Sequence, residues 1–284
     1  MKTVTSISGG KTSAYIAANY DSDALVFALV RTDDVKCKFK DRKTAQIVED
    51  RINNDFVGTL EDDTIIYTML DLEQFLGQKI EWVSGLTFDE VVRTKGTWLP
   101  SALRRYCTTW MKVDPIFYWW SEKFNFEPVK MNIGYRFSEV NRAYKMISQL
   151  NKNGLSEYKA TFEKHSEGRH KGKNKWELIE WREPSFPLID DQIFKDDIEN
   201  FWKDKPVRFA KRNNCVGCFH RNSRLLNQIS KEHPEKFAWF SEQEGGKKGF
   251  WKETISYEKI KELEFTGELN FYSTANCSSG FCGV

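Results

Sequence analysis

The stretch SISGGKTS near the N-terminus contains the residue types that bind phosphate groups. Between an apolar run and a helical pattern lie Ser8, Gly9, Gly10, Lys11, Thr12 and Ser13. Glycines let the backbone approach an anion closely, and the first N–H groups of a helix, together with its dipole, attract negative charge. Gly10-Lys11-Thr12 matches the end of a Walker A motif, but Thr5 stands where that motif requires glycine. We therefore expect a short phosphate-binding loop of another kind.

Four of the six cysteines occur as two close pairs, a spacing typical of metal ligands. Cys215 and Cys218 form a C-x-x-C pair, and Cys277 and Cys282 form a C-x4-C pair at the end of the sequence. Such pairs can surround a zinc ion or a [4Fe–4S] cluster with thiolates. We predict one metal site built from these two pairs, structural in role. Four unrelated thiols are the alternative, which the scarcity of cysteine disfavours.

Two further strings carry side chains suited to an anionic substrate. The strings RRYCTTWMKVDP (104–115) and NIGYRFSEV (132–140) supply Arg105, Cys107, Lys112, Gly134, Arg136 and Glu139. A guanidinium can bind a phosphate or sulfate group through two parallel hydrogen bonds. Asp33 and Asp34 follow an expected strand and are candidates for contact with a ribose or a metal ion. A solvated loop with a helix N-cap is the equal alternative for these two residues.

Short apolar runs alternate with helical patterns along the first half of the sequence. Strands are expected at 4–7, 24–30, 64–68, 80–83 and 129–133, and helices at 41–54, 88–94 and 115–124. This alternation predicts an α/β fold, with a doubly wound, mainly parallel sheet and helices on both faces. Ligands of such sheets bind beyond the carboxyl ends of the strands, where Ser8–Ser13 is expected. Further along, Asp190 stands where a helix cap is expected.

Composition changes along the chain suggest two parts. We expect a nucleotide-binding α/β domain over residues 1–200 and a small cysteine-containing subdomain over 201–284. The basic segment 164–175, KHSEGRHKGKNK, is expected to be an exposed loop. A solvated loop is favoured there over a contact with nucleic acid.

Charge and hydropathy narrow the class of protein. The 43 basic and 41 acidic residues give a net charge of +2, so the overall charge does not indicate a nucleic-acid-binding protein. No apolar run approaches the ~20 residues of a membrane span, and the N-terminus lacks the apolar core of a signal peptide. These features predict a cytoplasmic protein without membrane contact, in which cysteines are thiols or metal ligands rather than disulfides.

Taken in order, these strings resemble the phosphoadenosine-phosphosulfate reductase family of the adenine-nucleotide α-hydrolase superfamily, which also contains the N-type ATP pyrophosphatases. SGGKTS is similar to the S-G-G-x-[DT]-S loop of the pyrophosphatases, and 105–115 fits R-x-C-[CT]-x-x-x-K-x-x-P. A GxRxxES-like string is matched by Gly134, Arg136, Ser138 and Glu139 with a one-place shift of the Glu–Ser pair, and 187–190 fits PL-[IV]-[DE]. The resemblance runs from about residue 3 to about residue 240 and is fairly specific because four strings occur in order.

The resemblance implies ATP or phosphoadenosine phosphosulfate as ligand, with Mg²⁺. It implies nucleotide contacts from Ser8–Ser13, Asp33, Arg105, Lys112, Gly134 and Arg136. It implies catalytic roles for Lys11, Cys107, Arg136 and Glu139. We expect cleavage of ATP at the α-phosphate to activate an acceptor, with sulfur transfer to nucleic acid as in the sulfurtransferase of DNA phosphorothioation. In that case, phosphate contacts are expected from Lys171–Lys175 and from Arg208, Lys211, Arg212, Arg221 and Arg224.

The resemblance also leaves alternatives open. Iron–sulfur reductases of the family suggest a cluster on Cys107, Cys215 and Cys218, with Cys277 or Cys282 as the fourth ligand. Cys107 could instead relay sulfur, provided that Arg104, Arg105 or Lys112 lowers its pKa. A sulfonucleotide reductase that uses a C-terminal thiol is the second function, and a non-catalytic nucleotide-binding module is the third. A thiol or sulfur-donor protein and a second copy of the chain are the expected partners.

Overall fold

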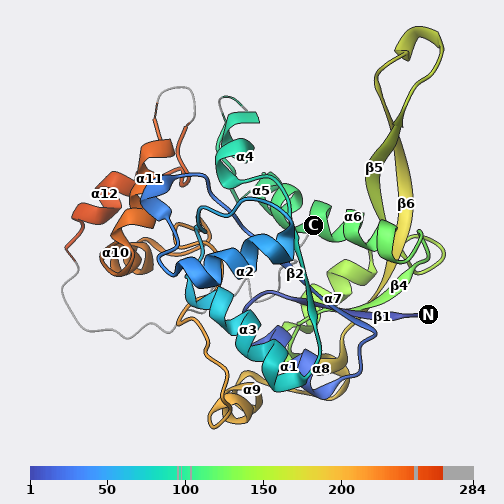
Figure 1. The fold of residues 1–284 in the computed structure, drawn as a ribbon, viewed down its shortest axis with the longest axis horizontal. Coiled ribbons are helices and arrows are strands. Elements are labelled where there is room, and N and C mark those ends of the chain that lie inside the picture. The colour runs from blue at the N-terminus through green and yellow to red at the C-terminus, as the bar shows by residue number, and fades with distance from the viewer. Residues whose placement is uncertain (95, 97, 103, 246–248, 265–284) are drawn as a thin grey trace.

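The computed structural model describes residues 1–94, 96, 98–102, 104–245 and 249–264, and they form an α/β fold around a six-stranded sheet (Figure 1). The strands are β1 (Thr3–Ile7), β2 (Ala24–Leu29), β3 (Ile80–Ser84), β4 (Val129–Asn132), β5 (Ser156–Lys164) and β6 (Asn174–Ser185). The helices are α1 (Lys11–Asn19), α2 (Arg42–Ile52), α3 (Thr64–Leu76), α4 (Phe88–Thr94), α5 (Tyr106–Thr108), α6 (Asp114–Lys123), α7 (Val140–Ile147), α8 (Pro187–Asp190), α9 (Lys195–Trp202), α10 (Ser223–Glu232), α11 (Pro234–Gln243) and α12 (Tyr257–Glu262). Shorter helical turns are η1 (Val35–Cys37), η2 (Thr109–Val113), η3 (Phe137–Glu139) and η4 (Gly168–His170).

The strand order is β3-β2-β1-β4-β6-β5. All neighbouring strands are parallel except β5 and β6, which form an antiparallel pair at one edge. The chain moves outward from β1 to β2 and β3, and β4 then lies on the other side of β1. This reversal creates a switch point between β1 and β4, where ligands of doubly wound sheets bind. The predicted fold class is confirmed.

Strand β2 shows why the sheet has helices on both faces. Its six residues are all buried, with Leu25, Phe27 and Leu29 in one hydrophobic cluster and Val26 and Ala28 in another. A strand that is buried on both faces reads as a continuous apolar run. Helices α1, α3 and α9 contribute to the first cluster, and α6 contributes to the second.

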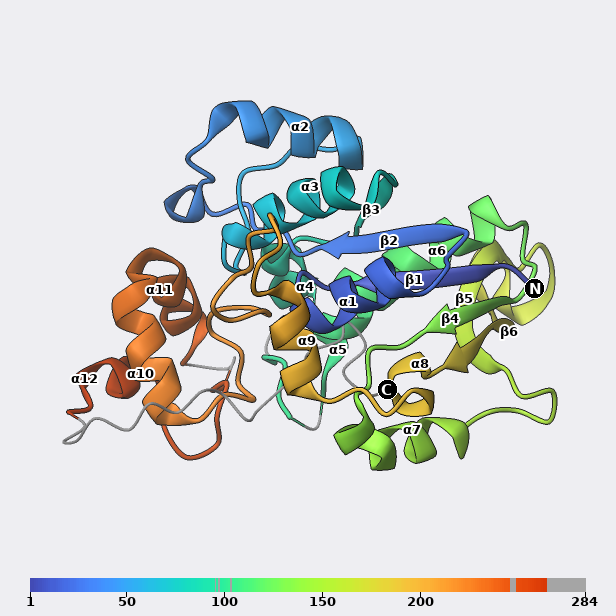
Figure 2. The same ribbon diagram turned by 90° about the horizontal axis from the view of Figure 1, so that it is seen from below.

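A third hydrophobic cluster joins distant parts of the chain. Helices α10, α11 and α12 pack together and share this cluster with α4 and with Cys107 of α5 (Figure 2). Phe88, for example, contacts the rings of Trp239 and Phe240 at centroid distances of 5.0 and 5.6 Å. The C-terminal helices therefore bury their apolar faces against the same region that carries Cys107.

Two local predictions are wrong. Residues 64–68 form the start of α3 rather than a strand, because the apolar pattern continues through Leu76 to a left-handed Gly77 that ends the helix. A short run such as TIIYT cannot be assigned to strand or buried helix by its pattern alone. Asp190 is the last residue of α8 rather than a helix cap, and α9 begins after Phe194, whose N–H donates to Asp197 Oδ2 at 2.8 Å.

The basic segment 164–175 is exposed, as predicted, but no local pattern indicated the strands that carry it. It forms the end of a long β5–β6 hairpin that extends away from the rest of the fold (Figure 1). Within the described part of the chain, no helix has the length and apolarity needed to cross a membrane.

Candidate functional site

The predicted phosphate loop lies at the carboxyl end of β1, beside the switch point. Gly9 has a left-handed backbone, with φ of +76°, and a Cβ placed there would lie 2.6 Å from Ile65 Cγ2. Gly9 is therefore the glycine that this turn requires, whereas Gly10 is extended, with φ of −97°. No side chain caps the N-terminus of α1 at Gly10. The loop thus presents helix N–H groups at the edge where nucleotides bind.

Ser13 closes the loop from inside the helix. Its Oγ accepts a hydrogen bond from Ser8 N at 3.1 Å and donates one to Gly10 O at 3.1 Å. Both serines are buried. These bonds hold the backbone of residues 8–13 in one conformation, which preorganises its donors for an anion.

Residues after β4 face the same loop across the switch point. A Cβ on Gly134 would lie 3.4 Å from Thr12 Cγ2, so β4 and α1 come close here. Arg136 is 7% exposed, and its Nε donates to Glu139 Oε2 at 2.9 Å. Glu139 also accepts from Arg142 Nη1 at 2.5 Å. The carboxylate of Glu139 therefore orients two guanidinium groups, a role that its sequence position did not specify.

Lys11 has a partner that the sequence did not indicate. Its ammonium group forms an ion pair with Glu199 of α9, and both side chains are partly exposed. Trp202, on the same helix, donates from Nε1 to Lys11 O at 3.0 Å. Glu199 is far from Lys11 in sequence and belongs to no motif, so only the packing of α9 on α1 places it here.

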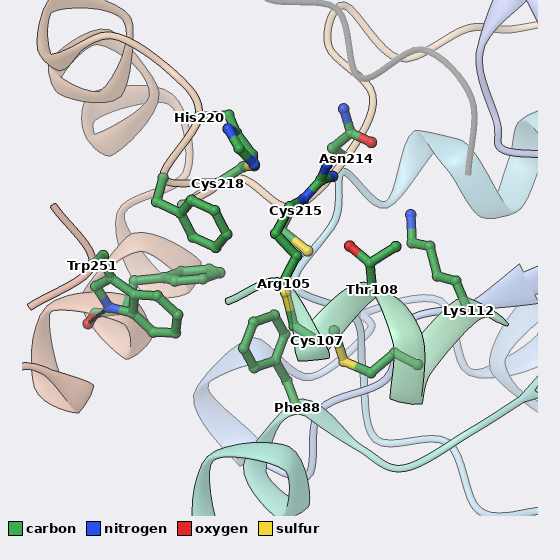
Figure 3. Close-up of a pocket in the computed structure, with 14 residues that line it drawn as sticks. Phe88, Arg105, Cys107, Thr108, Lys112, Asn214, Cys215, Cys218, His220 and Trp251 are labelled. Carbon is green, nitrogen blue, oxygen red and sulfur yellow. Dashed lines mark hydrogen bonds between the residues drawn. The ribbon is translucent and has the colours of Figure 1, made fainter. Parts of the chain in front are cut away.

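Three cysteines line one cavity, of about 60 Å³ (Figure 3). Cys107 comes from α5, while Cys215 and Cys218 come from the loop that precedes α10. Gly217 allows that loop to pack closely, since a Cβ there would lie 2.3 Å from the ring of Phe240. Backbone contacts fix the loop as well, because Val216 N donates to Leu60 O at 2.8 Å and Tyr257 Oη donates to Gly217 O at 2.9 Å.

Burial raises the pKa of two of these thiols, those of Cys107 and Cys215, and so favours their protonated form when no metal is bound. It raises the pKa of Cys107 to about 11, and repulsion from Cys218 adds to this. Burial, with the negative charge of Glu61, raises the pKa of Cys215 well above its ordinary value. Arg105 lowers the pKa of Cys107, but burial outweighs this effect, so the condition set for a sulfur relay through Cys107 is not met in the metal-free chain. A metal centre would supply the positive charge that converts such thiols into thiolates.

A cationic side chain, that of Arg105, links the cavity to the residues after β4. Arg105 interacts electrostatically with Cys107 and Cys218 and also with Tyr135 and Arg142, which lie near Arg136 in the sequence. Burial lowers the pKa of Arg105 itself. The thiol cavity and the residues after β4 are thus close enough to share one charged group.

Lys112 lies between the carboxylate of Glu61 and the thiol cavity. Its Nζ donates to Oε1 of Glu61 at 2.9 Å, and Glu61 is 1% exposed. Burial opposes the charged form of Lys112, but the negative charge of Glu61 and its hydrogen bond outweigh burial and raise the pKa of Lys112. Lys112 lines the thiol cavity, and its ammonium group is bonded to Glu61. These contacts give no sign of the predicted contact between Lys112 and a nucleotide.

Other predicted residues have separate surroundings. Asp33 is exposed and accepts from Thr87 Oγ1 at 2.8 Å, and Asp34 caps η1 by accepting from Lys36 N at 2.8 Å. The N-cap alternative therefore describes Asp34. Cys277 and Cys282 lie outside the described residues. Among those that are described, no group of three or more Cys, His, Asp or Glu side chains has an arrangement that could hold a metal ion.

Several basic residues expected to contact nucleic acid are occupied by carboxylates. Arg208 Nε donates to Asp71 Oδ2 at 2.7 Å, and both Lys211 and Arg212 pair with Glu232. Arg221 is 5% exposed and donates to Asn213 O at 2.6 Å. This part of the basic series is therefore engaged within the fold, by Asp71 of α3 and by groups of the C-terminal region.

Comparison of the chain with family models, with curated proteins and with solved structures found no match. The architecture and the site geometry therefore define a doubly wound α/β protein with a loop at its switch point and a thiol-lined cavity nearby. The family resemblance rests on the four sequence strings alone.

Proposed function

We propose that this chain is an adenine-nucleotide-binding enzyme that cleaves ATP at the α-phosphate and so activates an acceptor for sulfur transfer. The observation that carries the proposal is the position of the SGGKTS loop at the switch point of the sheet. There the loop lies against Gly134, and the ion-paired residues Arg136, Glu139 and Arg142 follow Gly134 in the chain. Nucleotides bind at this position in doubly wound folds.

The residues of the loop have distinct roles in this proposal. The N–H groups at the start of α1 and the ammonium group of Lys11 would stabilise negative charge on the departing pyrophosphate, with Mg²⁺ as counterion. Arg136, held by Glu139, would bind the acceptor end of the substrate through its guanidinium group. Glu139 then acts by positioning this arginine, since its carboxylate is already shared between two guanidinium groups.

We propose a [4Fe–4S] cluster on the set that includes Cys107, because three thiols line this cavity although the described residues are not arranged to hold a single metal ion. The cavity volume of about 60 Å³ is several times the 10–15 Å³ needed for one water, so it holds more than a single atom. Three thiols line it, and Arg105 and Lys112 provide positive charge against an anionic cluster. Cys107, Cys215 and Cys218 would bind the cluster, with Cys277 or Cys282 as the fourth ligand. When bound, the cluster would supply electron-transfer or sulfur-handling chemistry.

Product analysis tests the reaction. We expect the anaerobically purified protein to convert ATP, in the presence of an acceptor duplex and a sulfur donor, into AMP and pyrophosphate. Lys11→Ala should reduce this rate at least about tenfold because it removes one positive charge beside the leaving group. Incubation with phosphoadenosine phosphosulfate and a thiol is the parallel reaction. Sulfite from that reaction, without AMP from the first, would instead identify a sulfonucleotide reductase. If neither AMP nor sulfite forms, the chain is a non-catalytic nucleotide-binding module.

Glu199→Gln should strengthen ATP binding. The Glu199 carboxylate competes with a phosphate for Lys11, and both side chains are partly exposed, so the ion pair contributes at most ~1 kcal/mol. Removing it should lower the Kd for ATP by up to about fivefold in calorimetry. Glu258→Gln, which removes a similar ion pair with Lys261 on α12, is the matched control and should change nothing. Weaker binding in Glu199→Gln would mean that Glu199 orients Lys11 for the nucleotide.

A further inference from the structure

The β5–β6 hairpin forms an arm that stands apart from the sheet. Only the last part of β6 pairs with β4, from Arg182 to Ser185, whereas β5 pairs with β6 from Ser156↔Arg182 out to Lys164↔Asn174. Beyond Arg182, towards the tip of the hairpin, β5 and β6 therefore have only each other as hydrogen-bonding neighbours. Figure 1 shows this two-stranded ribbon projecting beyond the helices.

Aromatic contacts fix the direction of the arm at its base. Tyr158 of β5 and Trp181 of β6 pack on Phe117 of α6, at ring centroid distances of 4.7 and 5.5 Å. Phe162, farther out, contacts Tyr118 at 5.5 Å. The tip is ordered by its own backbone, since His165 N donates to the carbonyl oxygen of Lys173 at 2.9 Å. The arm is thus held in a defined orientation, which lowers the entropic cost of binding a partner.

The tip carries a concentrated positive charge. Segment 164–175 contains five lysines or arginines and a single carboxylate, Glu167. Lys175 is neutralised by Glu177 at 2.7 Å and by Glu163 at 3.6 Å. Within the described chain, no ion pair involves Arg169, Lys171 or Lys173, all of which are exposed. This differs from the C-terminal basic series, whose members Arg208, Lys211 and Arg212 pair with carboxylates.

One face of the arm also exposes apolar side chains. Trp176 and Leu178 are 55% and 67% exposed, and residues two apart on a strand share a face. Lys159 lies opposite Leu178 in the register and therefore belongs to the same face. This face lies beside the charged tip and is turned away from the Tyr158 and Trp181 side that packs on α6.

We propose that this arm binds duplex DNA, with the two-stranded ribbon in the major groove and the basic tip on the phosphates. The major groove of B-form DNA is about 12 Å wide and admits a two-stranded β-ribbon. The major groove of A-form RNA is too deep and narrow for protein side chains to read. Arg169, Lys171 and Lys173 would contact phosphates, and Trp176 and Leu178 would contact base edges or thymine methyl groups.

The arm supplies affinity at a distance from the candidate nucleotide site. Strand β6 runs from the arm towards Ser185 at the carboxyl edge of the sheet, so the tip extends from the opposite edge. Arm and phosphate loop can therefore be tested separately. DNA binding by the arm does not depend on the proposed function. Only the role of the bound duplex, as the sulfur acceptor or as the molecule that carries the acceptor, rests on the proposed function.

Fluorescence anisotropy with a labelled DNA duplex of about 30 base pairs, long enough to span several turns of the groove, tests the arm. The triple variant Arg169→Ala/Lys171→Ala/Lys173→Ala should weaken binding at least about tenfold, and the slope of log K against log[salt] should become shallower by about 0.9 for each phosphate that is no longer neutralised. Trp176→Ala should weaken binding by about fivefold or more without changing this slope, because it neutralises no phosphate. Lys40→Ala/Lys43→Ala/Lys231→Ala removes as much charge from exposed positions elsewhere and should bind normally.

Three results would overturn the proposal: no duplex binding by the wild-type chain, equally weakened binding in both triple variants, or equal affinity for a matched RNA duplex or single strand. An acidic protein partner would appear as binding that duplex DNA does not compete for. Calorimetry with ATP on the same variants separates this test from the proposed function. ATP affinity should be unchanged by the arm substitutions, and arm-dependent DNA binding without ATP cleavage would refute only the proposed function.

Discussion

Replacing Gly9 with alanine should lower the affinity for ATP about 100-fold or more, equivalent to ~2.7 kcal/mol. Gly9 has φ of +76°, and a Cβ at this position would lie 2.6 Å from Ile65 Cγ2 in α3. An alanine there must either strain the backbone or move the loop, and either change misplaces the N–H groups before α1. Calorimetry measures the weaker binding, and thermal unfolding measures the accompanying decrease in stability.

Gly154→Ala is the matched control for the strain itself. Gly154 has φ of +75°, but nothing lies within 4 Å of a Cβ placed there. It should lower the free energy of unfolding by about 1–2 kcal/mol through the left-handed backbone alone and leave ATP binding intact. Gly9→Ala should be destabilised more than this because of the added clash. If Gly9→Ala bound ATP as tightly as the control does, the loop would not be the phosphate site.

Features that depend on neighbouring residues could be predicted from the sequence. The phosphate loop is contiguous, so its glycines, hydroxyls and Lys11 indicate their position without knowledge of the fold. The strands 4–7, 24–30, 80–83 and 129–133 are short apolar runs and were predicted where the structure has them. The loop also shows the limit of such reasoning, because two adjacent glycines in the sequence do not reveal that Gly9 alone requires a left-handed backbone.

Features that depend on tertiary packing could not be predicted from the sequence. TIIYT at 64–68 is rich in residues that favour strands, yet α3 forms because the apolar face of Ile65, Met69 and Leu72 packs into the core. The long hairpin is weakly patterned in sequence, since β5 alternates charged residues with aromatics whose partners, such as Phe117 of α6, are far away in the sequence. Its turn lies within a basic segment that carries no short hairpin signal.

The composition of the cysteine cavity shows the same limit. The pairing of Cys215 with Cys218 is local, but Cys107 is far from both in the sequence, and only a resemblance suggested that it joins them. In the structure, the apolar cluster shared by α4, α5 and α10–α12 brings the two segments together. The contact of Glu199 with Lys11 was even less predictable from the sequence, because no local signal distinguishes Glu199 from the other acidic residues of α9.

If the proposed cluster is present, replacing any of the three cavity cysteines with serine should remove it. We expect Cys107→Ser, Cys215→Ser and Cys218→Ser each to reduce iron from about four atoms per chain toward zero and to abolish the visible absorption of the cluster. A serine hydroxyl is a poor substitute for a thiolate ligand, and each of the three thiols lines the cavity. Anaerobic purification, metal analysis and absorption spectra provide the measurement, and zinc in place of iron would contradict the cluster assignment.

Two further variants serve as controls for the choice between the ligand sets. Cys37→Ala is the control for removal of a buried thiol, because Cys37 is 2% exposed and does not line the cavity. It should keep the full metal content. The double variant Cys277→Ser/Cys282→Ser should be metal-free on either assignment, since both sets draw on the C-terminal pair. Cys107→Ser is therefore the decisive variant: absence of metal supports the set that includes Cys107, whereas full metal content would return the site to the two cysteine pairs and leave Cys107 beside the nucleotide.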